Sequence, residues 1–372
     1  MNIPLAKVDL SDEDMRRVND VLRSGWIMQG PCVEKFEKEV ARFCHAPHAV
    51  ATSSGTTALH LALEAVGVKR DDEVIVSSFS WIASANAIHY CGATPIFCDV
   101  DPETYNMKPE TVEPLITNQT RAILVVHQFG MPCDMEAFAA LAAQKQVMLV
   151  EDAACAIGSV YRGKPIGSCC HARATCLSFH PRKVVTTGEG GMVLTSNPEI
   201  ANTARMLRNH GIPSTPSANT FTHIGYNYRM TDIQAALGMG QMGRLPQTIR
   251  QRRAIAAHYQ TRLGNIYGIQ TPREPDDYES NFQSYMIRLT GKLSTMRDSI
   301  SSQLASAGVA TRKSIAPIHQ QPCYSKTCCT VLPETDRLAS DGLMLPLFTS
   351  MTEREVDDVC EQLEQAVNRF SP

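Results

Sequence analysis

The sequence predicts an α/β protein with a large domain built on a mostly parallel seven-stranded sheet and a smaller α/β domain after it. From residue 48 to about 195, short apolar runs alternate with helical patterns, as in sheets whose strands are joined by crossover helices. The pattern changes near Pro246, and 372 residues are enough for two domains. We therefore expect a large domain over residues 1–245 and a small one over residues 246–372.

Two amphipathic helices are expected before the sheet. Ser11 caps the first, over residues 11–24, and Asp14 completes a capping box. The break from Gly25 to Pro31 separates it from the second helix. The expected apolar sides consist of Met15, Val18, Val21 and Leu22 in the first helix, and of Val33, Phe36, Val40 and Phe43 in the second.

Seven short apolar runs are the predicted strands of the sheet. Ligands of such sheets bind beyond the carboxyl ends of the strands, where loops and helix N-termini meet. The runs cover residues 48–52, 73–77, 94–99, 122–127, 147–152, 175–179 and 192–196.

The C-terminal part is expected to begin in the 240s. A helix starting at Thr231 precedes Pro246, and a second, basic helix follows it through about Leu263. A strand over 285–289 and a helix over 296–307 come next. The last helix is capped by Thr352, with Glu355 at the third position.

Composition excludes several classes of function. A net charge of −3 with scattered basic residues gives no surface for nucleic acid or anionic membranes. No apolar run approaches the roughly 18–20 residues of a membrane span, and the first residues lack the pattern of a signal peptide, so we expect a cytoplasmic protein. The spacing of Cys169, Cys170 and His171 matches no common zinc site, and we expect no metal.

The most informative stretch surrounds Lys183. Ser178 precedes this lysine by five residues, and three glycines between 186 and 191 allow a tight turn after it. A lysine amine that is desolvated or close to other cations can lose its proton and act as a nucleophile on carbonyl groups. Taken alone, Lys183 could equally be a solvated surface lysine.

The sequence of residues 178–192, Ser-Phe-His-Pro-Arg-Lys-Val-Val-Thr-Thr-Gly-Glu-Gly-Gly-Met, resembles the lysine motif of the DegT/DnrJ/EryC1/StrS sugar aminotransferases. These are pyridoxal phosphate enzymes of fold type I. The resemblance implies that fold, and it implies that Lys183 binds the cofactor as a Schiff base and carries the catalytic proton. It extends from Gly25-Trp26 to the C-terminal helix, with six motifs in the order of the family.

Residues 53–58, Ser-Ser-Gly-Thr-Thr-Ala, follow the first strand and open a helix. A helix N-terminus offers free N–H groups to an anion, although an ordinary N-cap has the same pattern. The position resembles the phosphate loop of the family, so Thr56, Thr57 and Ser178 are the predicted phosphate ligands.

Three further residues are predicted to hold the cofactor ring. Trp81 follows the second strand and resembles the aromatic that stacks on the ring. Asp152 ends an apolar strand and matches the aspartate that pairs with the pyridine nitrogen. The resemblance implies that Cys155 lies near the 3-hydroxyl of the cofactor. There the chain departs from the family, because many members have glutamine at 155 and often histidine at 157, and a thiol is a weak hydrogen-bond partner.

The loop over 223–232, His-Ile-Gly-Tyr-Asn-Tyr-Arg-Met-Thr-Asp, resembles the family segment that crosses to a neighbouring subunit. The resemblance implies a homodimer with shared sites, in which Asn227 contacts the phosphate and Arg229 meets substrate. Residues 283–285 and 311–319 resemble segments that line the substrate side, and His319 is the candidate there.

The leading hypothesis is transfer of an amino group from glutamate or glutamine to a keto sugar, expected to be a nucleotide-linked keto-deoxy sugar. A keto cyclitol is an alternative acceptor, because specificity lies in loop contacts. A branch of the family that dehydrates sugars has histidine at the lysine position, and Lys183 of this chain counts against that reaction. A non-catalytic regulator or binding module would have lost the cofactor residues. A nucleotide-binding α/β protein would show Gly-x-Gly-x-x-Gly after the first strand, and this chain does not.

Overall fold

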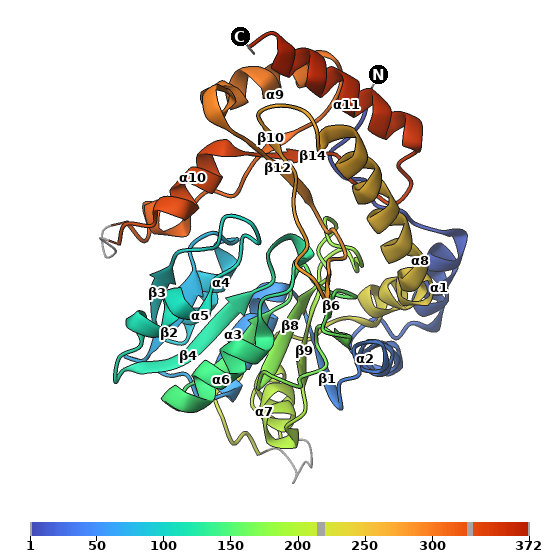
Figure 1. The fold of residues 1–372 in the computed structure, drawn as a ribbon. Helices are drawn as coiled ribbons and strands as arrows, with labels where there is room; N and C mark the ends of the chain where they lie inside the picture. The colour runs from blue at the N-terminus through green and yellow to red at the C-terminus, as the bar shows by residue number, and fades with distance from the viewer. Residues whose placement is uncertain (1, 214–219, 326–329, 371–372) are drawn as a thin grey trace.

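The computed structural model describes residues 2–213, 220–325 and 330–370, and two sheets organise them (Figure 1). The larger sheet has seven strands in the order β1-β9-β8-β5-β4-β2-β3, in which β9 runs antiparallel to both its neighbours and the other pairs are parallel. Every predicted strand corresponds to an observed one. These are β1 His48–Thr52, β2 Glu73–Ser77, β3 Thr94–Cys98, β4 Thr120–Val126, β5 Met148–Asp152, β8 Ala174–Ser178 and β9 Gly191–Thr195.

Helices cover both faces of this sheet, because successive side chains of a strand point to opposite faces. Val74 packs in the cluster on one face and Ile75 in the cluster on the other. The first face is covered by α3 (Gly55–Ala65), α4 (Ala83–Tyr90) and α7 (Pro198–Arg208). The other is covered by α2 (Pro31–Cys44), α6 (Met135–Lys145) and part of α8 (Asp232–Leu263), with α5 (Pro109–Val112) and η1 (Glu113–Leu115) at its edge.

Helix α1 (Asp12–Ser24) has the predicted cap and capping box, but two of the four residues on its predicted apolar side are exposed. Val21 is buried, whereas Met15 and Leu22 are about half exposed at 50% and 51%. The reason is that α1 packs on α8 through a polar contact, in which Arg244 donates from Nη1 to Asp14 Oδ1 at 2.8 Å. Met15 and Leu22 therefore face outward. In α2, by contrast, Val33, Phe36 and Val40 are buried as predicted.

The two helices expected on either side of Pro246 are one continuous helix, α8. Proline removes one backbone hydrogen bond inside a helix and crowds the preceding turn. Tertiary packing compensates for this cost, because α1 and α2 pack on one half of α8 and α11 (Glu353–Asn368) packs on the other. Figure 1 shows α8 running from beside α1 to beside α11.

The C-terminal part contains a four-stranded antiparallel sheet in the order β10-β12-β14-β13. Its core also includes Ile3, which pairs with Val309. We propose that the division between the domains lies between residues 245 and 246. Ile3 is the exception, because it precedes this division but packs in the core of the C-terminal domain. The elements are β10 Ile269–Gln270, β12 Tyr285–Leu289, η3 Gly291–Met296, α9 Arg297–Ser306, β13 Arg312–Lys313, η4 Ile318–Gln320, α10 Pro333–Asp341 and β14 Gly342–Leu345.

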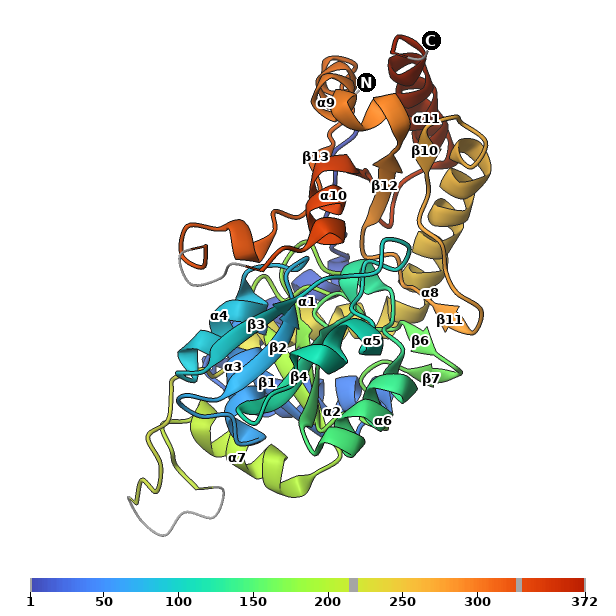
Figure 2. The same ribbon diagram turned by 60° about the vertical axis from the view of Figure 1, so that its left-hand side comes forward.

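A small three-stranded sheet, which the sequence did not indicate, connects the two parts (Figure 2). It consists of β6 (Val160–Tyr161), β7 (Lys164–Pro165) and β11 (Tyr278–Glu279), each only two residues long. Such short pairings carry no periodic pattern that could have predicted them. Within the described ranges, no helix combines the length and the apolar character that crossing a membrane requires.

Candidate active site

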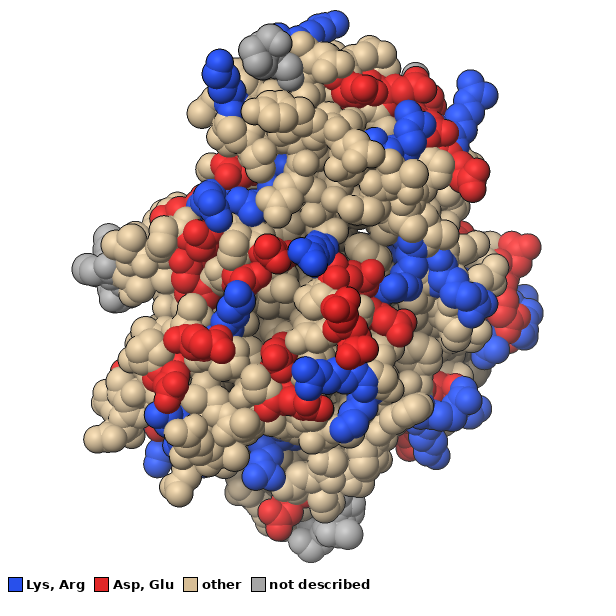
Figure 3. All heavy atoms as spheres, viewed as in Figure 1, with Lys and Arg blue, Asp and Glu red and all other residues tan. Residues whose placement is uncertain are grey.

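A cavity of about 480 Å³ opens at the carboxyl edge of the large sheet, where the four-stranded sheet faces it. On the surface this region is hollowed, with basic and acidic side chains around it (Figure 3). The cavity brings together most of the predicted residues from four separate segments of the chain. Lining it are Thr56, Trp81, Asp152, Cys155, Ser178 and Lys183.

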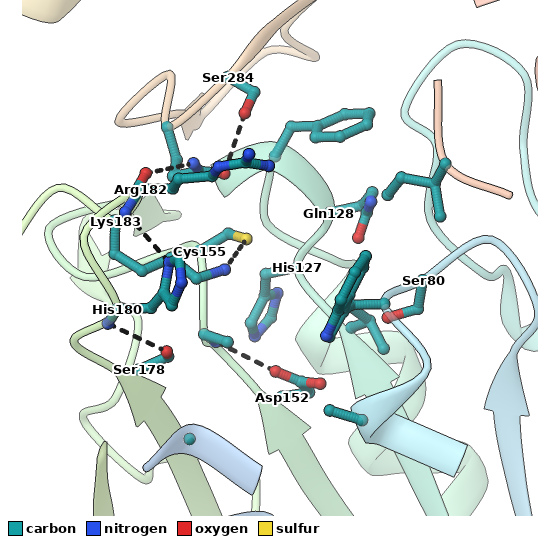
Figure 4. A pocket seen from close by; sticks show the side chains of 18 of the residues that line it. Ser80, His127, Gln128, Asp152, Cys155, Ser178, His180, Arg182, Lys183 and Ser284 are labelled. Carbon is teal, nitrogen blue, oxygen red and sulfur yellow. Dashed lines mark hydrogen bonds between the residues drawn. The ribbon is translucent and has the colours of Figure 1, made fainter. Parts of the chain in front are cut away.

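Lys183 lies in the connection between β8 and β9, as expected. Phe179, buried next to Phe36, holds the start of this connection, and its carbonyl oxygen accepts a hydrogen bond from the Thr187 N–H at 2.9 Å. Gly188 turns the chain with a φ of +81°, a value that glycine adopts without strain. The half-buried Lys183 side chain points into the cavity, and its Nζ donates to Cys155 Sγ at 3.0 Å (Figure 4).

Asp152 ends β5 with only 4% of its surface exposed. One carboxylate oxygen accepts a hydrogen bond from Ser84 Oγ at 2.7 Å, and the other accepts one from the Ala154 N–H at 3.1 Å. Among the residues that the structure describes, no lysine, arginine or histidine forms an ion pair with it. A buried carboxylate without a cation is costly. A protonated pyridine nitrogen would supply that cation, so Asp152 fits the cofactor that the resemblance implies.

The N-terminus of α3 fits a phosphate group. Ser54, Gly55 and Thr56 line the cavity, where the first N–H groups of the helix are free of helical partners. A Cβ atom on Gly55 would come within 2.8 Å of the Cβ of Ser178, so the glycine allows this serine to lie against the start of the helix. Backbone N–H groups and the hydroxyls of Thr56 and Ser178 together offer the donors that a phosphate needs.

Trp81, between β2 and α4, has 64% of its surface exposed, which is unusual for so large an aromatic residue. The guanidinium carbon of Arg312 lies 5.9 Å from the centroid of a Trp81 ring. This distance is within the range of a cation–π contact. An exposed indole on a cavity wall is suited to stacking on a flat ligand.

Two arginines line the cavity that were not among the individually predicted site residues. Arg182 precedes Lys183, and Arg312 belongs to β13 of the other sheet. Burial, and to a smaller extent the charge of Arg182, lower the pKa of Arg312. Neither guanidinium pairs with a carboxylate within residues 2–213, 220–325 and 330–370. Arg182 lies in the lysine motif and Arg312 in the stretch over 311–319 that the resemblance assigned to the substrate side, but only the tertiary structure shows that both line one cavity.

His127, just after β4, also lines the cavity and was not predicted as a site residue. Its ring is fully buried at the cavity wall, the Cys133 N–H donates to Nδ1 at 3.0 Å, and Nε2 lies 2.9 Å from Glu151 Oε2. Because Nδ1 accepts, Nε2 carries the hydrogen and donates it to the carboxylate. This pair fixes the orientation of the ring next to Asp152.

Four predicted residues do not line the cavity. The Thr57 hydroxyl donates to the Ser54 carbonyl oxygen at 2.8 Å as part of the helix cap. His319 is buried, with Nδ1 at 2.7 Å from Ser78 Oγ, so its ring has a partner away from the substrate side. Arg229 donates to Asn209 Oδ1 at 2.8 Å, and the exposed Asn227 pairs with the same segment through a β-bridge.

Comparison with known proteins agrees with this geometry. Residues 8–364 match the model of the DegT/DnrJ/EryC1/StrS aminotransferase family. The chain is 37% identical to GDP-perosamine synthase of Caulobacter vibrioides, with 98% of each chain covered. It is 36% identical to the spore coat polysaccharide biosynthesis protein SpsC of Bacillus subtilis, over 98% of this chain and 97% of that one.

A solved structure extends the likeness to three dimensions. The protein Spr1654 of Streptococcus pneumoniae in its PLP-form has a TM-score of 0.94 with 29% sequence identity, and all of both chains is covered. The family match spans nearly the whole chain, and the cavity residues fit the cofactor. This chain is therefore a pyridoxal phosphate-dependent aminotransferase of the DegT/DnrJ/EryC1/StrS family.

Proposed function

We propose that this aminotransferase moves an amino group from glutamate or glutamine to the keto carbon of a nucleotide-linked keto-deoxy sugar. The observation that carries the proposal is the pair of arginines, Arg182 and Arg312, on a cavity wall shared with Lys183 and Asp152. The name of the relative from Caulobacter vibrioides, GDP-perosamine synthase, supports a nucleotide-linked amino sugar as the product. The cytoplasmic location stays a prediction.

When bound, pyridoxal phosphate supplies a ring that accepts electrons from the substrate carbon. The Lys183 amine would hold the cofactor and, when free, would carry the proton that leaves the substrate carbon. Asp152 would pair with the ring nitrogen, and Trp81 would contact the ring. Thr56, Ser178 and the N–H groups of α3 bind the phosphate. Cys155, 3.0 Å from the Lys183 amine, holds that amine in the cavity.

The arginines favour an acceptor with a diphosphate group. Two guanidinium groups that lie close together repel each other, and after burial the charge of Arg182 is the second cause that lowers the pKa of Arg312. An anion between them relieves that repulsion, and arginine binds phosphate oxygens in bidentate fashion. Arg182 lies in the connection between β8 and β9 of the large sheet and Arg312 in β13 of the four-stranded sheet, so a diphosphate would also hold the two sides of the cavity together. A keto cyclitol without phosphate would not need this pair.

We also propose a homodimer in which the loop carrying Asn227 and Arg229 completes the site of the other copy. Neither residue lines the cavity of its own chain. The same loop exposes 93% of Ile224, and the segment after α1 exposes Trp26 and Met28 by more than half. Exposed apolar residues of this kind are typical of surfaces that another chain covers. A second copy explains both the exposed apolar side of α1 and the outward position of the loop.

The experiment separates the two halves of the reaction. Glutamate is added to the holoenzyme, the change in cofactor absorption is followed, and the aminated form is then given either a nucleotide-linked keto sugar or a keto cyclitol. We expect amination of the nucleotide-linked sugar, detected by mass spectrometry. In Arg182→Ala and Arg312→Ala, the KM for this acceptor should rise about tenfold each, with the glutamate step unchanged.

Arg250→Ala, at an exposed position on α8, is the matched control and should behave like the wild type. Preferential amination of the cyclitol would contradict the proposed acceptor. A glutamate step that weakens as much as the acceptor step would assign the arginines to the donor carboxylate instead.

A further inference from the structure

A second cluster of ligand-type side chains lies outside the cavity, where the C-terminal halves of α3 and α4 meet. His60 and Glu64 are one turn apart on α3, and Cys91 directly follows α4. A ring nitrogen of His60, a carboxylate oxygen of Glu64 and Cys91 Sγ all lie within 4.8 Å of one another. We propose that these three side chains bind a divalent zinc-type metal ion.

The histidine provides the strongest evidence. Only 3% of His60 is exposed, and its buried Nε2 has no hydrogen-bond partner among the described residues. The nearest oxygen of Glu64, Oε1, lies 3.4 Å from this nitrogen, and the two form an ion pair only when the ring is protonated. A buried polar atom without a partner is costly, and this one lies next to a carboxylate and a thiol.

The spacing suits a tetrahedral ion. Zinc binds nitrogen and oxygen ligands at about 2.0–2.2 Å, so two such ligands of one ion stand about 3.4 Å apart. This is the separation of His60 Nε2 and Glu64 Oε1. The thiol currently donates to the Ala87 carbonyl oxygen at 3.3 Å, so a change of rotamer would bring the sulfur to the ion.

Surrounding groups orient two of the ligands, as is usual around metal sites. The ring nitrogen Nδ1 of His60 lies 3.2 Å from the hydroxyl of Tyr228, and Tyr226 donates to Glu64 Oε1 at 2.7 Å. Nitrogen, carboxylate and thiolate together favour zinc or cobalt over calcium or magnesium. Three protein ligands leave the fourth position to water.

Binding requires the thiolate. Burial, together with the charge of Glu64, raises the pKa of Cys91 to about 12, so without metal the sulfur keeps its proton. The metal–sulfur bond forms as the S–H bond breaks, and the proton leaves to solvent.

The ion would join three segments that matter to the proposed function. It would connect the helix whose N-terminus faces the phosphate, the helix that follows Trp81, and the loop that carries Asn227, through Tyr226 and Tyr228. The ion would thus be a structural metal that holds this loop against α3 through Tyr228 and Tyr226.

The test uses the holoenzyme, treated with a chelator, dialysed and titrated with zinc chloride alone. Bound zinc is quantified by inductively coupled plasma mass spectrometry, and the thermal unfolding midpoint is measured with and without metal. We expect one zinc per chain and a higher midpoint in the wild type. In Cys91→Ala and Glu64→Gln, zinc affinity should fall at least tenfold and the midpoint should no longer respond.

Cys170→Ala removes an exposed cysteine elsewhere and should bind zinc like the wild type. Cobalt chloride provides a second readout, because thiolate-bound tetrahedral cobalt has red absorption bands away from those of the cofactor, and Cys91→Ala should lose them. Circular dichroism shows whether Cys91→Ala and Glu64→Gln are folded. Loss of zinc binding in two folded variants cannot be caused by misfolding. A wild type that takes up no zinc, or folded variants that retain wild-type affinity, would overturn the proposal.

Discussion

The cavity and the loop of Asn227 differ in how they are held. Residues of the cavity follow strand ends of one sheet, so Asp152, Ser178 and Lys183 meet within a single chain. The loop is held by the end of α7, where the Tyr226 and Tyr228 N–H groups donate to the Leu207 and Arg208 carbonyl oxygens, and it lines no part of its own cavity. Chemistry that depends on strand ends is therefore assembled in one copy, whereas the loop serves a second copy in the homodimer that we propose.

Lys183→Ala should have the largest effect, because it removes both the cofactor attachment and the proton carrier. We expect amino transfer to fall by about a thousandfold or more. Steady-state turnover and the absorption of the bound cofactor measure it. Lys164→Ala, at an exposed lysine of β7, is the control and should leave both unchanged. Near-normal turnover in Lys183→Ala would remove the lysine from the mechanism.

Asp152→Asn should lower turnover by about a hundredfold, because an amide cannot keep the ring nitrogen protonated. The side chain has nearly the same shape, so the fold should persist. Ser84→Ala removes only one hydrogen bond to the same carboxylate and should cost severalfold. If turnover in Asp152→Asn were close to that in Ser84→Ala, charge at this position would not be required.

Asn227→Ala tests the other region directly. We expect weaker cofactor binding, by about tenfold, from the loss of a phosphate contact supplied by the partner copy. At a cofactor concentration too low to fill Asn227→Ala, mixing it with inactive Lys183→Ala by unfolding and refolding should raise activity to about a quarter of the wild-type level, because half of the random dimers have one intact site out of two. Activity no higher than that of the separate variants would place both residues in the same chain's site.

The smallest effect concerns His180, which lines the cavity next to the lysine connection. Burial lowers its pKa, the charges of Lys183 and Arg182 add to this, and Glu189 opposes it. The unfolded chain keeps the ordinary value of about 6.5 and takes up the proton first, so stability is complete above that pH and falls as the pH decreases through it.

We therefore expect the unfolding midpoint of the wild type to decline between about pH 7 and pH 5.5 more than that of His180→Asn. Thermal scans at several pH values measure it. His45→Asn is the control, since this exposed histidine has a φ of 59°, which asparagine tolerates. Parallel curves for His180→Asn and wild type would show that His180 does not contribute.

Local pattern alone predicted much of this molecule. Alternating apolar runs located all seven strands of the main sheet, and capping boxes located the starts of α1 and α11, because these signals depend on residues close together in the chain. The lysine stretch indicated the cofactor through its similarity to a family, and the family match confirms that cofactor.

Tertiary structure decided the rest. It joined the chain through Pro246 into one helix, since neighbouring helices compensate for the lost backbone hydrogen bond, and it turned Met15 and Leu22 outward because a polar contact holds α1. It also brought Arg312 to the wall that Arg182 lines, and Cys91 to His60 and Glu64. Contacts between segments far apart in sequence leave no local periodicity, so only the folded chain reveals which charges and ligands meet.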